Sequence, residues 1–246
     1  MTASLLQSRA VIRLSPTEEG EDVTAFLQGL LTNNVAGALP VYAGLLTPQG
    51  KMLFDMFVWP AGEGAILLDC EAEHADELAK RFSLYRLRRK IDIAVDDTVG
   101  VHWTAHGGDG GAPDPRMAAL GQRWLAPANG SDEAADDAYL AHRLSLGVPE
   151  GRAEMGDILW LETNAVELNG VAFDKGCYIG QENTARMNWR SKVNRRLMIV
   201  SIDKSDEKRR KTQYPDHGLA VDHLRVSDIE PESAPVWLRD SLISAE

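Results

Sequence analysis

The sequence predicts an α+β fold, because helical and strand patterns follow one another along the chain without an internal repeat. Two apolar runs, residues 41–46 and 51–59, are joined by Thr-Pro-Gln-Gly, a turn sequence that favours a β-hairpin. Residues 21–31 place apolar side chains on one face at helical spacing. With 246 residues, of which 44% are hydrophobic, the chain can bury a sizeable core.

The remaining elements of the first half are short. Residues 10–14, AVIRL, read as a strand, although the first fifteen residues lack acids and contain two arginines, as a transit peptide would. We favour the strand. Acids early and bases late indicate a helix over residues 72–85, and further strands are expected at residues 65–69, 91–95 and 99–104.

The second half contains fewer clear patterns. Residues 106–115, rich in Gly and Pro, predict an exposed loop rather than a phosphate cradle, since no GK[ST] follows. Residues 203–211 form a mixed charge run, read as a solvated turn or linker. The tail beyond it is too short for an independent domain. We expect helices at residues 134–146 and from about Gln181, and strands at residues 197–202 and 219–226.

Charge and cysteine content exclude several classes of protein. A net charge of -11 argues against general nucleic-acid binding, which depends on Lys and Arg. No apolar run is long enough to cross a bilayer, so no membrane partner is expected. Cys70 and Cys177 lie far apart without CxxC spacing, which indicates neither a disulfide framework nor a zinc site. A reducing cytoplasm is the expected location.

The stretch from 173 to 187, FDKGCYIGQENTARM, places Cys177 between Lys175 and a predicted helix start. The helix dipole and the lysine ammonium would both favour a thiolate, the reactive form, whereas Glu182 would oppose it. The alternative is a small cysteine buried in a tight turn. Cys70, at the end of an apolar strand, is expected to be structural.

The motif also carries a resemblance. KGCYIGQE at residues 175–182 is similar to the signature of the YgfZ-type folate-binding proteins, relatives of a mitochondrial iron–sulfur maturation factor and of the glycine-cleavage T-protein. Other similar stretches follow in the expected order, and the resemblance covers roughly residues 8 to 200. These stretches are FLQGLLTNNV, GLLTPQGKMLFD, YRLRRKIDI, HRLSLGVPEG and LETNAVELNGVAFDKGCY.

The resemblance implies an α+β fold of interleaved T-protein-like subdomains around a central cavity, with a shortened C-terminal β-barrel. The folate-binding region would span residues 1–196, its smaller subdomain roughly residues 40–100. Residues 197–246 would form the barrel remnant. The cavity would hold tetrahydrofolate or a related folate.

The implied function is assembly or repair of iron–sulfur clusters in client enzymes, tRNA-modifying ones among them. The protein would be a maturation factor rather than an enzyme, and its partners would be iron–sulfur client or assembly proteins. Cys177 would be the functional thiol, assisted by Lys175, and a transient iron or cluster ligand. One thiol cannot cage a [4Fe–4S] cluster, so partners or a dimer would supply other ligands.

Two alternatives remain open. A folate-dependent aminomethyltransferase would need an acid near the reacting amine, and a folate-binding regulator would need no chemistry. The acids available for the first alternative are Asp55, Asp69, Asp92 and Glu162.

Folate carries an anionic tail and a flat pterin, so its site should offer Arg or Lys together with amide or carboxylate groups. YRLRRK could equally be a basic helix end. The stripe Arg186, Arg190, Lys192, Arg195 and Arg196 could meet RNA or an acidic partner, although a solvated face is favoured, and Trp189 is a contact residue or core. The predicted ligand-binding set is Asn33, Gln49, Tyr85, Arg86, Arg88, Tyr178, Gln181 and Glu182.

Overall fold

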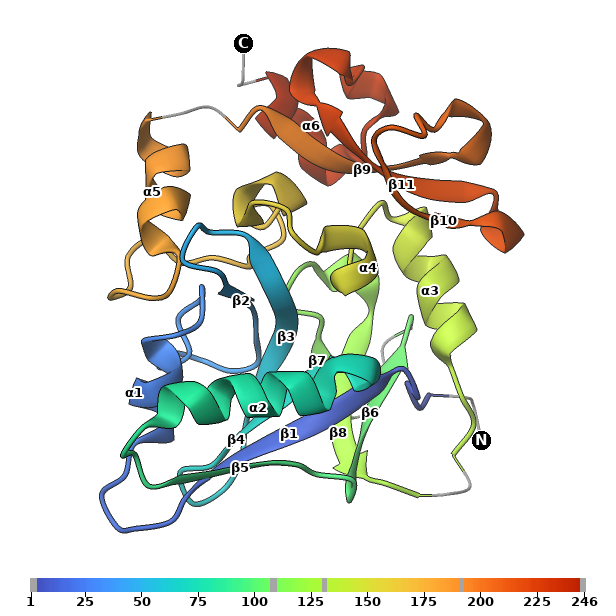
Figure 1. Ribbon diagram of the computed structural model, residues 1–246. Helices are drawn as coiled ribbons and strands as arrows, with labels where there is room; N and C mark the ends of the chain where they lie inside the picture. The colour runs from blue at the N-terminus through green and yellow to red at the C-terminus, as the bar shows by residue number, and fades with distance from the viewer. Residues whose placement is uncertain (1–3, 107–109, 130–131, 191–192, 244–246) are drawn as a thin grey trace.

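The computed structural model describes residues 4–106, 110–129, 132–190 and 193–243. Three antiparallel sheets are joined by helices (Figure 1). The strands are β1 (Arg9–Pro16), β2 (Val41–Leu46), β3 (Met52–Pro60), β4 (Ile66–Glu71), β5 (Ile91–Val95), β6 (Val99–Thr104), β7 (Ala112–Pro113), β8 (Gln122–Pro127), β9 (Arg195–Ser201), β10 (Arg210–Tyr214) and β11 (Leu219–Arg225). The α-helices are α1 (Val23–Gln28), α2 (Ala75–Arg86), α3 (Asp136–Ser145), α4 (Arg152–Met155), α5 (Gln181–Arg190) and α6 (Val236–Ile243).

The largest sheet has the strand order β2-β3-β4-β1-β5, and its strands β2, β3 and β4 are buried on both faces. Met56 and Val58 of β3 pack in the core that contains α1 and α2, whereas Phe57 and Trp59 pack in the core on the opposite face. This alternation is the period of two that a strand imposes. The predicted hairpin of residues 41–46 and 51–59 is confirmed by the pairing of β2 with β3.

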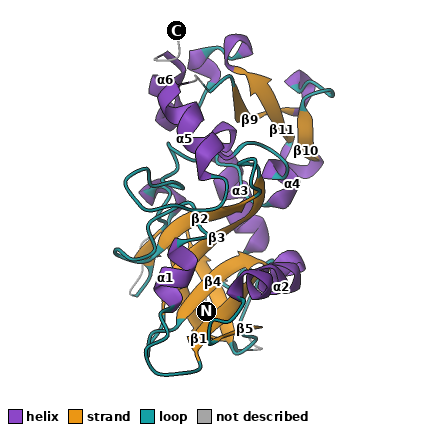
Figure 2. Ribbon diagram, turned by 60° about the vertical axis from the view of Figure 1, so that its left-hand side comes forward, coloured by secondary structure: helices purple, strands orange, loops and turns teal. Residues whose placement is uncertain are grey.

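Two smaller sheets complete the fold. One has the order β6-β8-β7, and the other, β10-β11-β9, lies with α6 at the end of the molecule opposite α1 and α2 (Figures 1 and 2). The C-terminal sheet is open, with β10 and β9 as its edges. That this sheet is the remnant of a β-barrel stays a prediction, as does the division of the chain into two regions after residue 196.

Several predicted elements are confirmed with shifted ends. The strand over residues 10–14 is β1, and the strands over residues 91–95 and 99–104 are β5 and β6. Helix α1 is shorter than the predicted 21–31. Asp22 accepts a hydrogen bond from the Ala25 amide and caps its N-terminus, and Gly29 is the C-cap that follows Gln28. The predicted smaller subdomain of residues 40–100 contains strands that pair on both sides of β1.

Other expectations were met only in part. The predicted exposed loop of residues 106–115, of which 107–109 lie outside the described residues, includes β7 and the buried Asp114. The charge run of residues 203–211 is the predicted solvated turn, mostly exposed, and its end forms the start of β10. Asp222 holds this turn by accepting hydrogen bonds from Ser205 Oγ and from the Asp206 amide. The prediction also lacked β8 and α6, neither of which shows a clear period in the sequence.

Candidate functional site

Lys175 anchors the turn that carries Cys177 to the end of helix α1. Its Nζ donates hydrogen bonds to the backbone carbonyls of Gln28 (2.8 Å), Leu31 (2.5 Å) and Asn33 (2.9 Å). Carbonyls at a helix C-terminus lack partners within the helix, and a cation there also complements the helix dipole. The lysine therefore holds the cysteine turn against α1.

This arrangement changes the predicted role of Lys175. Burial lowers the pKa of Lys175 to about 8, whereas the three carbonyls favour its charged form. An ammonium has three N–H donors, and each has a carbonyl partner, so none is left for the Cys177 sulfur. The structure gives Lys175 a structural role in place of the predicted pairing with the thiol.

Two glycines let the cysteine turn approach the β2–β3 hairpin. Gly180 has a φ of +82°, and a Cβ at this position would lie 2.6 Å from the Thr47 carbonyl oxygen and 3.0 Å from the Gly50 Cα. Across the same contact, Asn183 Nδ2 donates to the Gln49 carbonyl at 2.7 Å. Helix α5 begins directly afterwards, which confirms the predicted start at about Gln181. The turn is therefore fixed at both ends.

The two cysteines differ in their access to solvent. Cys177 is exposed, so the alternative of a small buried cysteine is excluded. Cys70 is buried, and burial raises its pKa to about 12, which suppresses the reactive thiolate. The structural role predicted for Cys70 agrees with this environment.

The rest of the predicted ligand-binding set does not converge on one pocket. Asn33 Nδ2 donates to the carbonyls of Tyr42 (2.8 Å) and Asn169 (2.7 Å). Tyr178 is buried, and burial raises its pKa to about 12. The other members of the set near the motif lie at the surface, Gln49 and Glu182 exposed and Gln181 half-buried.

Tyr85, Arg86 and Arg88 do lie together. They line an open groove of about 860 Å³ between α1 and the end of α2, with Phe26 and Leu30 of the α1 side in its lining. Arg86 Nη1 donates to the Ile91 carbonyl at 2.8 Å. The groove and the cysteine turn both contact the α1 segment.

The predicted basic stripe is divided by the fold. Arg186 and Arg190 are exposed on α5, whereas Arg196 is buried and lies 2.8 Å from Glu167. Lys192 lies outside the described residues. Because Arg196 belongs to the interior, the favoured solvated face was wrong for this residue.

Trp189 on α5 is 73% exposed, which excludes the core alternative. Its ring meets that of Phe173 edge-on, with 6.1 Å between the ring centres. Trp189 is therefore available as a contact residue beside the cysteine motif.

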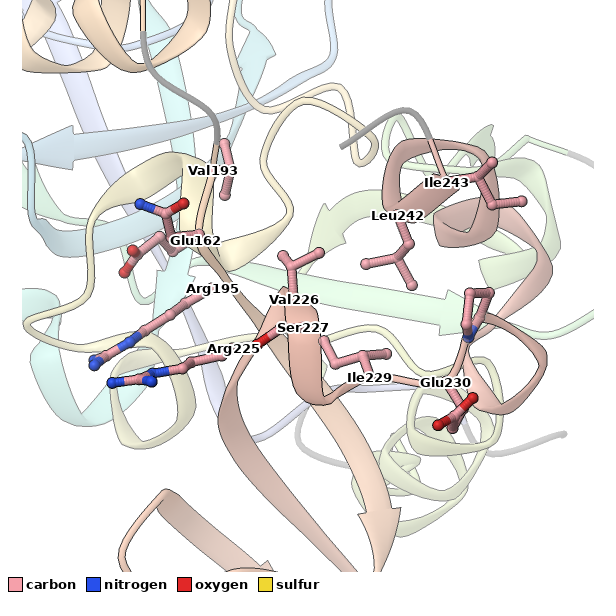
Figure 3. A pocket seen from close by; sticks show the side chains of 12 residues that line it. Glu162, Val193, Arg195, Arg225, Val226, Ser227, Ile229, Glu230, Leu242 and Ile243 are labelled. Carbon is pink, nitrogen blue, oxygen red and sulfur yellow. The ribbon is translucent and has the colours of Figure 1, made fainter. Parts of the chain in front are cut away.

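A cavity of about 900 Å³ lies beside the C-terminal sheet (Figure 3). Arg195 and Arg225, opposite each other in β9 and β11, project together on one side, and Leu242 lines the other. The cavity also contains Glu162, whose carboxylate lies 3.0 Å from His223 Nε2. Glu162, one of the acids available for a transferase, therefore contacts the C-terminal sheet through His223 of β11.

The other predicted acids have different environments. Asp92 is exposed on β5, and Asp69 forms ion pairs with Arg9 and Arg123. Asp55 is buried, and Tyr42 Oη donates to its Oδ2 at 3.1 Å. Its Oδ1 has no hydrogen-bond partner among the described residues, and burial raises the pKa of this carboxyl.

Sequence reasoning missed a buried ionic network, defined here as Arg9, Arg116, Arg123, Asp69, Asp114 and Glu150. Arg123 Nη1 lies 2.7 Å from Asp69, and Arg116 Nη1 lies 2.6 Å from Glu150. These arginines hold the pKa of Glu150 well below its ordinary value despite burial. The network joins β1, β4 and β8 to the segment after α3. In the sequence Asp69 stands only as an available acid, and no local pattern pairs it with Arg9 or Arg123, which lie 60 and 54 residues away.

A smaller cavity of about 460 Å³ opens beside this network. Glu71 lines it, and burial, assisted by the charge of Asp55, raises the pKa of Glu71 to about 7. Its Oε2 accepts a hydrogen bond from the Arg152 amide at 2.8 Å. The cavity lining carries an excess of acids, namely Glu71, Glu73, Asp136, Asp137 and Glu150 against Arg9 and Arg143.

Within the described residues, no group of three or more His, Cys, Asp and Glu side chains could hold a metal ion. No helix in that same part of the chain is long and apolar enough to cross a membrane.

Comparison with known proteins finds relatives that are named as iron–sulfur cluster assembly factors. It is 32% identical over 231 residues to the mitochondrial iron–sulfur cluster assembly factor IBA57 homologue of Neurospora crassa, covering 78% of this chain and 52% of that one. The human IBA57 is 33% identical over 235 residues, covering 79% and 65%. The mouse protein is 30% identical over 242 residues, covering 82% and 66%. The chain therefore spans about half to two thirds of these relatives. No protein-family model matches it.

The names of these relatives describe mitochondrial proteins, so the expectation of a cytoplasmic protein was wrong. Among solved structures, the glycine cleavage system aminomethyltransferase T of Bartonella henselae matches with a TM-score of 0.67 at 11% identity. The match covers 92% of this chain and 79% of that one. The T-protein-like fold implied by the motif is confirmed at this level. The chain is a homologue of the IBA57 iron–sulfur cluster assembly factors, built on the fold of the glycine-cleavage aminomethyltransferase.

Proposed function

We propose that this chain supports the maturation of iron–sulfur clusters in partner proteins, with Cys177 as a cluster ligand shared with the partner. The observation that carries the proposal is the exposure of Cys177 on a turn fixed by Lys175 and Gly180. The homologous assembly factors support the class of reaction. That the partner proteins include enzymes that modify tRNA stays a prediction.

One thiol needs help to hold a cluster. Iron–sulfur clusters are ordinarily bound by several thiolates, and Cys70 cannot contribute because it is buried. The remaining ligands therefore come from the partner protein, and the cluster is cargo that passes through the complex. Trp189, exposed beside the motif, provides an aromatic contact of the kind that anchors protein interfaces.

The predicted folate set does not support a folate site. Its members near the motif are used in backbone hydrogen bonds, buried or spread over the surface, while Tyr85, Arg86 and Arg88 line a separate groove. The cavity at Glu71 could bind a pterin edge with its carboxylate, but its two arginines are already paired with acids, and nothing positive remains for the anionic tail. The proposed function therefore includes no folate-dependent step.

The aminomethyltransferase alternative has one observation in its favour, the buried Asp55 with an unpartnered oxygen. This carboxyl is buried and enclosed by Tyr42 and the Gly151 amide, so a substrate amine would not reach it. We therefore assign the chain an accessory role without transferase chemistry.

The thiol hypothesis is tested by cluster reconstitution. The purified chain is mixed with iron, sulfide and an iron–sulfur carrier protein from which the cluster has been removed. The visible absorbance of the cluster that forms is then followed. Cys177→Ala should abolish the shared cluster and its transfer to an apo-client, while the protein stays folded because the side chain is exposed. Cys177→Ser should reduce both.

Cys70→Ala is the matched control, and it should leave the cluster spectrum unchanged apart from a modest loss of stability. An unchanged spectrum and transfer rate in Cys177→Ala would refute the thiol as ligand.

A further inference from the structure

The groove between α1 and α2 combines apolar surface with an exposed, strained leucine. Leu87, which lines it, is 85% exposed and adopts a φ of +51° and a ψ of -109°. The Arg89 amide donates to the Arg86 carbonyl at 2.9 Å, which closes a turn with Leu87 in its second position. A turn with positive φ at that position is of the kind that strongly prefers Gly.

Leu87 therefore lowers the stability of the folded chain, and no contact of its side chain within the described residues offsets that loss. Its side chain lies in solvent, so burial does not stabilise it. A glycine would fit the same turn without strain. Strain that the folded chain does not explain is characteristic of positions that contact a ligand or partner.

The charges around the groove indicate which kind of partner it would bind. Three arginines line it, Arg86, Arg88 and Arg89, against a single acid, Glu21, on a chain whose net charge is -11. Arg89 is paired with Glu21 at 2.6 Å. Arg88 is exposed and has no ion-pair partner in the part of the chain that the structure describes.

The same turn borders a second cleft, of about 530 Å³, that shares residues 86–89 with the groove. Leu87 and Arg88 thus form a ridge with a cleft on each side. We propose that this ridge and groove dock a partner protein through an amphipathic segment whose apolar side chains contact Leu87 and Tyr85 and whose acids pair with Arg88.

This inference does not depend on the chemistry of Cys177. A partner in the groove would lie against α1, whose last residue, Gln28, accepts a hydrogen bond from Lys175 of the cysteine turn. A partner seated there would share one element with the motif.

The test uses the 246-residue chain and synthetic helical peptides of about four turns. The probe has Leu on one face and Glu on the other; one control peptide has Lys for Glu, and another has Ser for Leu. Binding is measured by fluorescence anisotropy at about 50 mM and about 300 mM sodium chloride, because salt screens surface charges. We expect the Leu/Glu peptide to bind about tenfold more tightly than either control, and more weakly at high salt.

Variants separate docking from folding. Arg88→Glu should weaken binding about tenfold without changing the melting temperature, and Lys204→Glu, an exposed lysine on the C-terminal part of the chain, should change neither. Leu87→Gly should weaken binding about tenfold while raising the melting temperature by about 2–4 °C, because it relieves the strained turn. A merely structural leucine would give the opposite thermal shift.

Several results would overturn the proposal. These are equal binding of the Lys and Glu peptides, wild-type affinity in both groove variants, displacement of the peptide by tetrahydrofolate, or a concentration-dependent dimer that Leu87→Gly dissolves. The last two would assign the groove to a small molecule or to a second copy of the chain.

Discussion

Single residues in this structure show how burial changes the chemistry of a side chain. Glu71 and Cys70 are neighbours in the sequence, yet one lines a cavity and the other is buried in the core. Both have raised pKa values, because leaving water disfavours the charged form. The exposed Cys177 experiences no such burial. The reactivity of each thiol therefore follows from its position in the fold.

Glu71 should make stability depend on pH. Its pKa is about 7 in the folded protein and 4.5 ordinarily, so its contribution to stability is fully present below pH 4.5 and is lost as the pH rises through 7. Glu71→Gln keeps an acceptor for the Arg152 amide but cannot ionise. The variant should gain about 1–2 kcal/mol relative to wild type at about pH 8 and little at about pH 4.5.

Thermal unfolding at several pH values measures this difference. Glu73→Gln, an exposed neighbour that lines the same cavity, is the control and should give a difference that does not vary with pH. If the gain of Glu71→Gln were the same at both ends of the pH range, the buried carboxylate would not be the cause.

At the level of elements, the close contact of the cysteine turn with the β2–β3 hairpin should depend on Gly180. Gly180→Ala would force a Cβ to within 2.6 Å of a backbone oxygen at a positive φ, and it should cost about 1–3 kcal/mol. Urea denaturation measures the loss, and the reconstituted cluster yield should fall with it because the turn shifts.

Gly176→Ala is the control from the same motif. A Cβ there meets nothing within 4 Å, so its stability should stay within about 0.5 kcal/mol of wild type. Equal losses in the two variants would show that the turn is not fixed by its approach to the hairpin.

Elements were predictable where the pattern is local. The β2–β3 hairpin, β5, β6, β11 and the start of α5 follow from turn residues and apolar periodicity. Strand β8 was not predictable, since its burial alternates only weakly. The turn that carries Cys177 could be predicted, although the residues left open whether its thiol is exposed or buried. The hydrogen bonds of Asn33 could not be predicted, because its carbonyl partner at Asn169 is 136 residues away.

The whole molecule depends on pairings that no local pattern reveals. The buried ionic network joins residues from Arg9 to Glu150 and connects the large sheet to the β6-β8-β7 sheet. Arg9, Arg116 and Arg123 are buried, and buried arginines are stable inside a protein only when acids neutralise their charge. The network therefore fixes the relative position of the two sheets and occupies space between them.

Arg123 tests this role for the whole fold. Arg123→Met leaves Asp69 and Asp114 with less neutralising charge in the interior, so it should cost about 3–5 kcal/mol. Arg13→Met, which breaks the half-exposed pair with Asp96 in the same large sheet, should cost less than about 1 kcal/mol.

Urea unfolding followed by tryptophan fluorescence and by circular dichroism decides the outcome. If the network joins the two sheets, both probes should report one transition that moves to lower urea in Arg123→Met. Because Arg123 and Asp69 share the network, Arg123→Met combined with Asp69→Asn should cost about 1–3 kcal/mol less than the sum of the single changes. Two separate transitions, with one of them unmoved, would show instead that the sheets fold independently and that the buried charges stabilise only their own neighbourhood.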